Sequence, residues 1–234
     1  MSEPVSIPPV ARRSFLTRLG AGLTVAGTTM AAGDALAQSP APPPSNWQPA
    51  RHTLDNWMDQ LPGKHRFVFD TTTADGLGTS LLYANNFFLA SQTGYGLGDA
   101  EAAVIIVARH NSTPFAYNDV VWAKYGTLIA ARTGLNDPKT KRPPAVNLFN
   151  TTAEGLTNLG TTVDSLVKRG VHFAVCQMAT WFFAGQLAQA TGGNADAVYS
   201  EIAANLVGNS HLVPAGIVAV SRAQERRYTF ASVG

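Results

Sequence analysis

Short apolar runs alternate with longer segments of helical periodicity along most of this chain. The clearest run is 102–109 (AAVIIVAR), where a continuous apolar stretch precedes an arginine. Such a run is typical of a strand that is buried on both faces in a parallel sheet. Shorter runs of the same kind predict further strands at 65–70, 171–176, 211–213 and 228–231.

Helical periodicity fills the intervals between these runs. Leu77, Leu81, Ala84 and Phe88 recur along one stripe of the segment 77–92. Further helices are predicted at 119–132, 152–169 (closed by Gly170), 178–190, 195–207 and 214–226 (begun by Pro214), after a short amphipathic segment around Trp57. Strands that alternate with helices predict one α/β domain, with a mostly parallel sheet covered by helices on both faces.

The N-terminal region has the pattern of an export signal rather than of a folded element. Arg12 and Arg13 precede an apolar stretch at 19–32, and an Ala-Leu-Ala cleavage site ends at residue 37. We therefore interpret 1–37 as a twin-arginine signal peptide that directs the protein to the periplasm. The alternatives are a basic, flexible N-terminus or a membrane anchor, but the stretch is shorter than the roughly 20 apolar residues of a spanning helix. We expect no stable membrane span.

A proline-rich segment at 38–50 is predicted to be an extended linker, which leaves 51–234 as the folded domain. The formal net charge of the chain is +2, and no basic stripe suggests a nucleic-acid partner. Lys139, Lys141 and Arg142 form one basic cluster, which we interpret as a solvated loop.

The one cysteine of the chain, Cys176, ends the predicted strand 171–176 and directly precedes a predicted helix. A thiol in this position lies near the positive end of a helix dipole, which can turn it into a nucleophile. The export route leads to an oxidising compartment, but a single cysteine forms no internal disulfide. Cys176 is therefore either buried or kept for its reactivity.

Three strand ends carry polar or reactive side chains: Asp70, the pair Arg109 and His110, and Cys176. Sites in parallel sheets form beyond the carboxyl ends of the strands, so His110 or Arg109 could lie near the thiol and favour its thiolate form. The alternative is that both residues only solvate the end of a strand. We take Cys176, His110 and Arg109 as the candidate catalytic residues.

The remaining histidines and glycines give weaker indications. His172 shares a strand face with Cys176, but about 13 Å of strand separates the two, so we interpret His172 as structural. No cluster is visible among His52, His65 and His211, and no zinc-binding spacing occurs. Gly76 and Gly78 lack the third glycine of a dinucleotide fingerprint and are interpreted as a turn. We predict no cofactor and no metal.

Trp181, Phe182 and Phe183 follow Cys176 closely in the sequence. Neighbouring residues on a helix point about 100° apart, so three adjacent aromatic side chains cannot all face one core. At least one of them is expected in a pocket, at a subunit contact or in solvent, and we favour an oligomer interface.

Two segments resemble the DsrE/DsrF-like family: 170–176 (GVHFAVC), and 212–220 (LVPAGIVAV) with the residues that follow it as far as Tyr228. The resemblance covers roughly 64–234 and is strongest in the C-terminal third. It implies a three-layer, flavodoxin-like α/β subunit that assembles as a trimer or hexamer. It also implies that Cys176 lies at the position where some members carry sulfur as a persulfide.

Three functional hypotheses follow. In the first, the protein is a sulfurtransferase or sulfur carrier that takes sulfane sulfur from a small sulfur compound onto Cys176. In the second, it is a non-catalytic module that binds a small molecule or a protein in the same crevice. In the third, Cys176 is buried as a small apolar residue.

Overall fold

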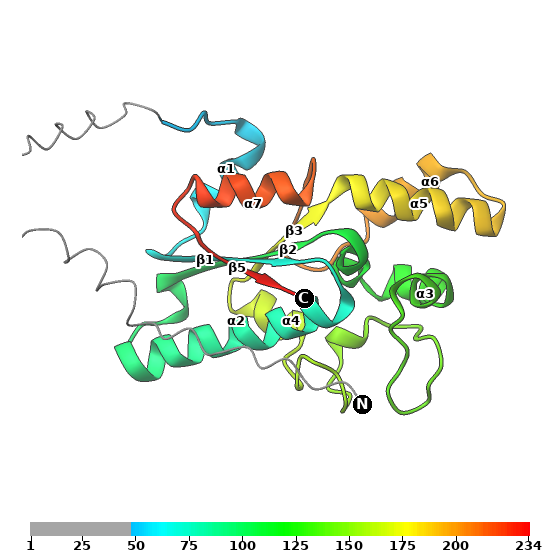
Figure 1. Cartoon of the computed structure of the whole chain (residues 1–234), viewed down its shortest axis with the longest axis horizontal. Helices are drawn as coiled ribbons and strands as arrows, with labels where there is room; N and C mark the ends of the chain where they lie inside the picture. Colours follow the sequence, from blue (N-terminus) through cyan, green and yellow to red (C-terminus); the bar gives the residue numbers. More distant parts are fainter. Residues whose placement is uncertain (1–47) are drawn as a thin grey trace, which may run out of the picture. The chain divides into compact units, whose positions relative to one another are not determined.

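Five parallel strands form one sheet in the computed structural model, which describes residues 48–234 (Figure 1). The strands are β1 (His65–Thr71), β2 (Ala102–Ala108), β3 (His172–Cys176), β4 (Ser210–Val213) and β5 (Thr229–Val233). Their order in the sheet is β4-β3-β2-β1-β5. The central strand β2 is buried along its whole length, as its apolar run predicts. The prediction of a mostly parallel sheet is confirmed.

Helices cover both faces of this sheet, which gives three layers (Figure 1). The helices α1 (Asn56–Gln60) and α7 (Gly216–Gln224) lie on one face, and α2 (Ala74–Tyr95) and α4 (Val163–Lys168) lie on the other. Three more helices lie together beyond the carboxyl end of β3: α3 (Asp119–Thr133), α5 (Gln177–Thr191) and α6 (Ala195–Ala203). The prediction of a three-layer, flavodoxin-like α/β fold is confirmed.

The sheet separates two apolar cores. The smaller core lies between the sheet and the helices α1 and α7, and it includes Met58, Ile105 and Ala219. The larger core lies on the opposite face and extends into the space between α3, α5 and α6. This arrangement leaves the N-termini of α5 and α7 close to the carboxyl ends of β2, β3 and β4.

One edge of the sheet differs from the usual flavodoxin-like order, in which the second strand lies beside the first. Here the last strand, β5, takes that position and pairs with β1 in register Phe67 with Thr229. The chain therefore crosses from the β4 edge to the opposite edge through α7, which packs against all five strands. As a result, the end of β5 lies at the carboxyl end of β1.

The predicted helix 152–169 is wrong over most of its length, because only Val163–Lys168 is helical. Gly155 (φ +84°) and Gly160 (φ +82°) adopt left-handed backbone conformations that interrupt a right-handed helix. The helix begins where the Thr162 hydroxyl accepts a hydrogen bond from the Ser165 amide at 3.1 Å. The segment before Thr162 consists of turns.

The prediction of a turn at Gly76 and Gly78 is also wrong, because both residues lie inside α2. A Cβ atom at Gly76 would collide with the carbonyl oxygen of Val233, and one at Gly78 would collide with Phe149. Both glycines therefore serve close packing rather than chain reversal. Other boundaries shift by a few residues: α2 extends from Ala74 to Tyr95, α6 ends at Ala203, and α7 runs from Gly216 to Gln224.

The predicted export signal (1–37) lies outside the described residues, as does the predicted linker (38–50) up to residue 47. Both stay predictions. Within residues 48–234, no helix combines the length and the apolar character that crossing a bilayer requires.

Candidate functional site

A pocket of about 370 Å³ opens at the carboxyl edge of the sheet, beyond β2 and β3. The end of β2 and the loop after it contribute one side of the pocket, the first turns of α5 and α7 contribute two others, and one residue comes from α3. The lining residues are Arg109, His110, Asn111, Arg132, Cys176, Met178, Ala179, Phe182, Phe183, Ala215, Gly216 and Ile217. The structure thus brings the three candidates Cys176, His110 and Arg109 to one pocket.

Cys176 is both the last residue of β3 and the N-cap residue of α5. Its sulfur atom accepts a hydrogen bond from the Ala179 amide at 3.4 Å. This N–H belongs to the first turn of a 15-residue helix, and its dipole stabilises negative charge on the sulfur. The side chain is buried, with 6% of the residue exposed, and it meets solvent through the pocket.

A chain of buried hydroxyl groups fixes the backbone of Cys176 from the opposite side. Thr180 donates a hydrogen bond to the Cys176 carbonyl oxygen at 3.0 Å, and Tyr117 donates one to the Thr180 hydroxyl at 3.2 Å. Burial raises the pKa of Tyr117 above its ordinary value, so this phenol stays protonated and acts as a donor. These contacts hold the turn from β3 into α5.

Arg109 lies at the pocket, but its guanidinium group is bound to the carboxylate of Asp70. Its Nε and Nη2 atoms donate to the two carboxylate oxygens of Asp70 at 2.7 and 2.8 Å. This bidentate hydrogen bonding raises the pKa of the Arg109 guanidinium. The Asp70 side chain is almost fully buried, so its charge compensates much of the positive charge that Arg109 could offer to the thiolate.

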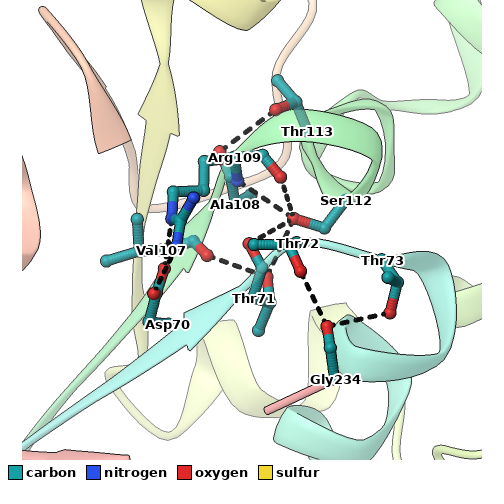
Figure 2. Close-up of polar contacts among 10 residues, drawn as sticks. All are labelled: Asp70, Thr71, Thr72, Thr73, Val107, Ala108, Arg109, Ser112, Thr113 and Gly234. Atoms are coloured by element: carbon teal, nitrogen blue, oxygen red, sulfur yellow. Dashed lines mark hydrogen bonds and ion pairs between the residues drawn. The ribbon is translucent and has the colours of Figure 1, made fainter. Parts of the chain in front are cut away.

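Ser112 forms hydrogen bonds that hold the start of the loop after β2, next to Arg109 (Figure 2). Its hydroxyl oxygen accepts hydrogen bonds from the Arg109 amide and the Thr71 hydroxyl, both at 2.9 Å. The Thr71 hydroxyl also lies 2.8 Å from the Val107 carbonyl oxygen, as a second possible acceptor. No sequence pattern indicates Ser112 or Thr71, because their roles depend on the pairing of β1 with β2.

The part of the carboxyl edge above β1 is filled by the chain itself. The hydroxyl groups of Thr72 and Thr73 donate to the Gly234 carbonyl oxygen at 2.8 and 3.1 Å (Figure 2). This carbonyl occupies the space in front of the first turn of α2. The crevice that stays open is therefore the one beside β2 and β3, where Cys176 lies.

His110 is exposed and adopts a left-handed backbone conformation (φ +57°) at the start of a 3-10 helix. This conformation turns the chain sharply after β2 and places His110 at the pocket. Within residues 48–234, no hydrogen bond joins His110 or Arg109 to the Cys176 sulfur. The two residues share a pocket with the thiol without contacting it through hydrogen bonds.

The aromatic residues after Cys176 separate as helical geometry requires. Phe183 is buried in the protein, Phe182 lines the pocket with half of its surface exposed, and Trp181 stacks on Tyr199 of α6 at 3.7 Å between ring centroids. The expectation that at least one of them lies in a pocket, at a subunit contact or in solvent is confirmed. The preferred account, an oligomer interface, stays a prediction.

Arg132 is a pocket residue that sequence reasoning missed. It lies in the last turn of α3, and its guanidinium carbon is 5.2 Å from the centroid of the Phe182 ring. From the sequence, Arg132 is recognisable only as a basic residue at the end of a helix. Its position beside Phe182 depends on the packing of α3 against α5, which the sequence pattern does not show. Met178 and Ile217 also line the pocket and were likewise not singled out.

His211 contacts His172, a residue with which the sequence did not associate it. His172 Nδ1 and His211 Nε2 lie 2.9 Å apart across β3 and β4, and the Trp57 indole stacks on His211 at 3.9 Å between centroids. Burial and then the neighbouring His172 lower the pKa of His211 to about 4, and burial lowers the pKa of His172 as well. This contact could not be predicted from a spacing motif, because the two histidines are 39 residues apart in sequence.

This pair predicts a pH dependence of stability. His211 titrates near pH 6.5 when unfolded and near pH 4 when folded, so the unfolded chain binds more protons between these values. We expect the contribution of neutral His211 to the free energy of unfolding to be complete above pH 6.5. This contribution is lost as the pH falls towards 4. Urea unfolding of the wild type and His211→Gln at several pH values measures it. Identical pH dependences of the two proteins would contradict the prediction.

Comparisons with protein-family models, with curated proteins and with solved structures gave no match. The resemblance to the DsrE/DsrF-like family therefore stays a prediction from the residues around Cys176 and Pro214. Within residues 48–234, no three His, Cys, Asp or Glu side chains gather where they could hold a metal ion. The pocket around Cys176 is thus the basis for a functional proposal.

Proposed function

We propose that the protein is an exported carrier of sulfane sulfur, which it holds as a persulfide on Cys176. The observation that supports this proposal is the position of the thiol. Cys176 lines an open pocket, and its sulfur accepts a hydrogen bond from the first turn of α5. This position combines access for a small molecule with stabilisation of negative charge, which a nucleophilic thiolate and a persulfide anion both need.

The proposed reaction is a simple displacement, shown here for tetrasulfide. The Cys176 thiolate attacks a terminal sulfur atom of the tetrasulfide dianion. A new S–S bond forms at Cys176, the adjacent S–S bond of tetrasulfide breaks, and trisulfide leaves with the electron pair. The charges balance, and no oxidant or reductant is consumed. The product is a persulfide anion at the N-terminus of α5, in the position where the thiolate was.

Intact-mass spectrometry after exposure to sodium tetrasulfide tests the proposal. We expect the folded wild type to gain one sulfur atom and the isosteric variant Cys176→Ser to gain none. The wild type unfolded in urea, with the same cysteine but without the α5 helix, is the matched control and should gain sulfur more slowly. A folded wild type that gains no sulfur under these conditions would rule the proposal out.

A second candidate function is non-covalent binding of a small molecule in the same pocket. It is favoured by the apolar lining from Met178, Phe182 and Ile217, which a sulfur carrier for inorganic compounds does not need. In this case Cys176 is only part of the wall. Unchanged ligand binding by Cys176→Ser, together with no sulfur uptake by the wild type, would support this function over the first.

A further inference from the structure

The mouth of the pocket exposes apolar side chains to an unusual extent. Met178 is 69% exposed, Phe182 49% and Ile217 57%, and these residues come from two helices that meet at the pocket. Phe183 and Ala215 continue the apolar surface inward. Pockets with such walls bind ligands that have an apolar body, because water is then displaced from both surfaces. A small, strongly hydrated inorganic anion gains nothing from these walls.

The charge at the pocket indicates one anionic group on the ligand. Arg109 is paired with Asp70, so its charge is already compensated within the protein. Arg132 forms no ion pair with any residue of the described range 48–234. Its guanidinium lies against the Phe182 ring, which places a positive charge directly beside the apolar wall. A ligand that fits both features is an apolar group with a single negative charge next to it.

We infer that the sulfur donor of this protein is an organic thiosulfonate, R–SO₂–S⁻, in which R is apolar. This inference rests on the proposed function and names the donor for the same cysteine. The group R would lie against Phe182 and Met178, and the sulfonyl oxygens would accept hydrogen bonds from Arg132. Thiosulfate carries the same sulfane sulfur but has a second charge and no apolar group.

The transfer step balances without a further reactant. The Cys176 thiolate attacks the terminal sulfur of R–SO₂–S⁻, and a new S–S bond forms at the cysteine. The S–S bond of the thiosulfonate breaks, and the sulfinate R–SO₂⁻ leaves with the electron pair. Arg132 would hold the sulfonyl group in the thiosulfonate and in the departing sulfinate. Arg132 is thus a binding residue for the donor and its product.

Binding can be tested separately from sulfur transfer with benzenesulfonate, which lacks the sulfane sulfur. The measured quantity is the rate at which iodoacetamide alkylates Cys176. We expect benzenesulfonate to slow alkylation about tenfold at ten times its dissociation constant. Sulfate at equal ionic strength should have no such effect. Equal protection by sulfate would overturn the inference.

Two arginine variants assign the effect to the pocket. Arg132→Gln should abolish protection by benzenesulfonate. Arg142→Gln, an equal change at an exposed residue of the loop after α3 that does not line the pocket, should retain it. Undiminished protection of Arg132→Gln would overturn the role of Arg132 and with it the inference.

Sulfur uptake then distinguishes the inference from the proposed function. We expect the wild type to gain sulfur faster from benzenethiosulfonate than from thiosulfate, as measured by intact mass. Equal rates, or a faster reaction with thiosulfate, would overturn the inference and leave the proposed function supported. Protection by benzenesulfonate without sulfur uptake from benzenethiosulfonate, thiosulfate or tetrasulfide would overturn the transfer step and the proposed function alike.

Discussion

Asp70→Asn is expected to lower the free energy of unfolding by about 3 kcal/mol. The substitution keeps the shape of the side chain but removes the charge that faces the Arg109 guanidinium at 2.7 Å. The Asp70 carboxylate is only 4% exposed, so in the variant the neutral amide of asparagine, and not water, occupies its place beside Arg109. Breaking a buried ion pair by removing one partner leaves the other charge uncompensated, which is costly. Urea denaturation followed by circular dichroism measures the change.

Asp99→Asn is a matched control for this prediction. Asp99 also accepts two hydrogen bonds from one arginine, Arg169, at 2.8 and 2.9 Å. Its side chain, however, is 39% exposed, so solvent screens the pair and replaces its hydrogen bonds. We expect this variant to lose less than about 1 kcal/mol. Similar losses for the two variants would show that burial does not set the strength of the Asp70 pair.

Gly126→Ala is expected to lower the free energy of unfolding by about 3 kcal/mol, although alanine is the better helix former. Gly126 lies buried inside α3. A Cβ atom there would collide with the carbonyl oxygen of Pro144, which belongs to the backbone and cannot turn aside. The loop after α3 would have to move away from the helix. Thermal and urea unfolding of the variant measure the loss.

Gly185→Ala makes the same substitution inside another helix, α5, and should have the opposite effect. Within residues 48–234, and apart from its chain neighbours and the adjacent backbone of α5, no heavy atom lies within 4 Å of a Cβ atom built at Gly185. The variant is expected to gain up to about 1 kcal/mol from helix propensity alone. A destabilisation of Gly185→Ala as large as that of Gly126→Ala would show that tertiary contact is not the cause in α3.

The strands were predictable because a buried strand requires a short run of apolar residues, which is visible in the sequence. The run 102–109 is apolar at every position before Arg109, and β2 is buried throughout. Helix boundaries were less accessible, since they depend on single residues with special backbone conformations. In the segment 152–162 the prediction of a helix fails. Gly155 and Gly160 have left-handed backbone conformations there, so the backbone cannot be helical although the apolar periodicity continues.

The candidate site was predictable in part. Cys176, Arg109 and His110 end neighbouring strands, and the carboxyl ends of parallel strands meet at one edge. The commitment of Arg109 to Asp70 was not predictable, because it requires the pairing of β1 with β2 in one particular register. Likewise, β5 filled the space above β1 only because it pairs with that strand.

The α/β alternation, the buried central strand and the cysteine at the junction of β3 and α5 could all be predicted from the amino-acid sequence. These features depend on local periodicity and on residues adjacent in the chain. The meeting of Arg132 and Phe182 with Cys176 at one pocket, and the contact between His172 and His211, arise only when the chain folds. Such contacts join residues that are distant in sequence, and the order of the strands and the packing of the helices bring them together.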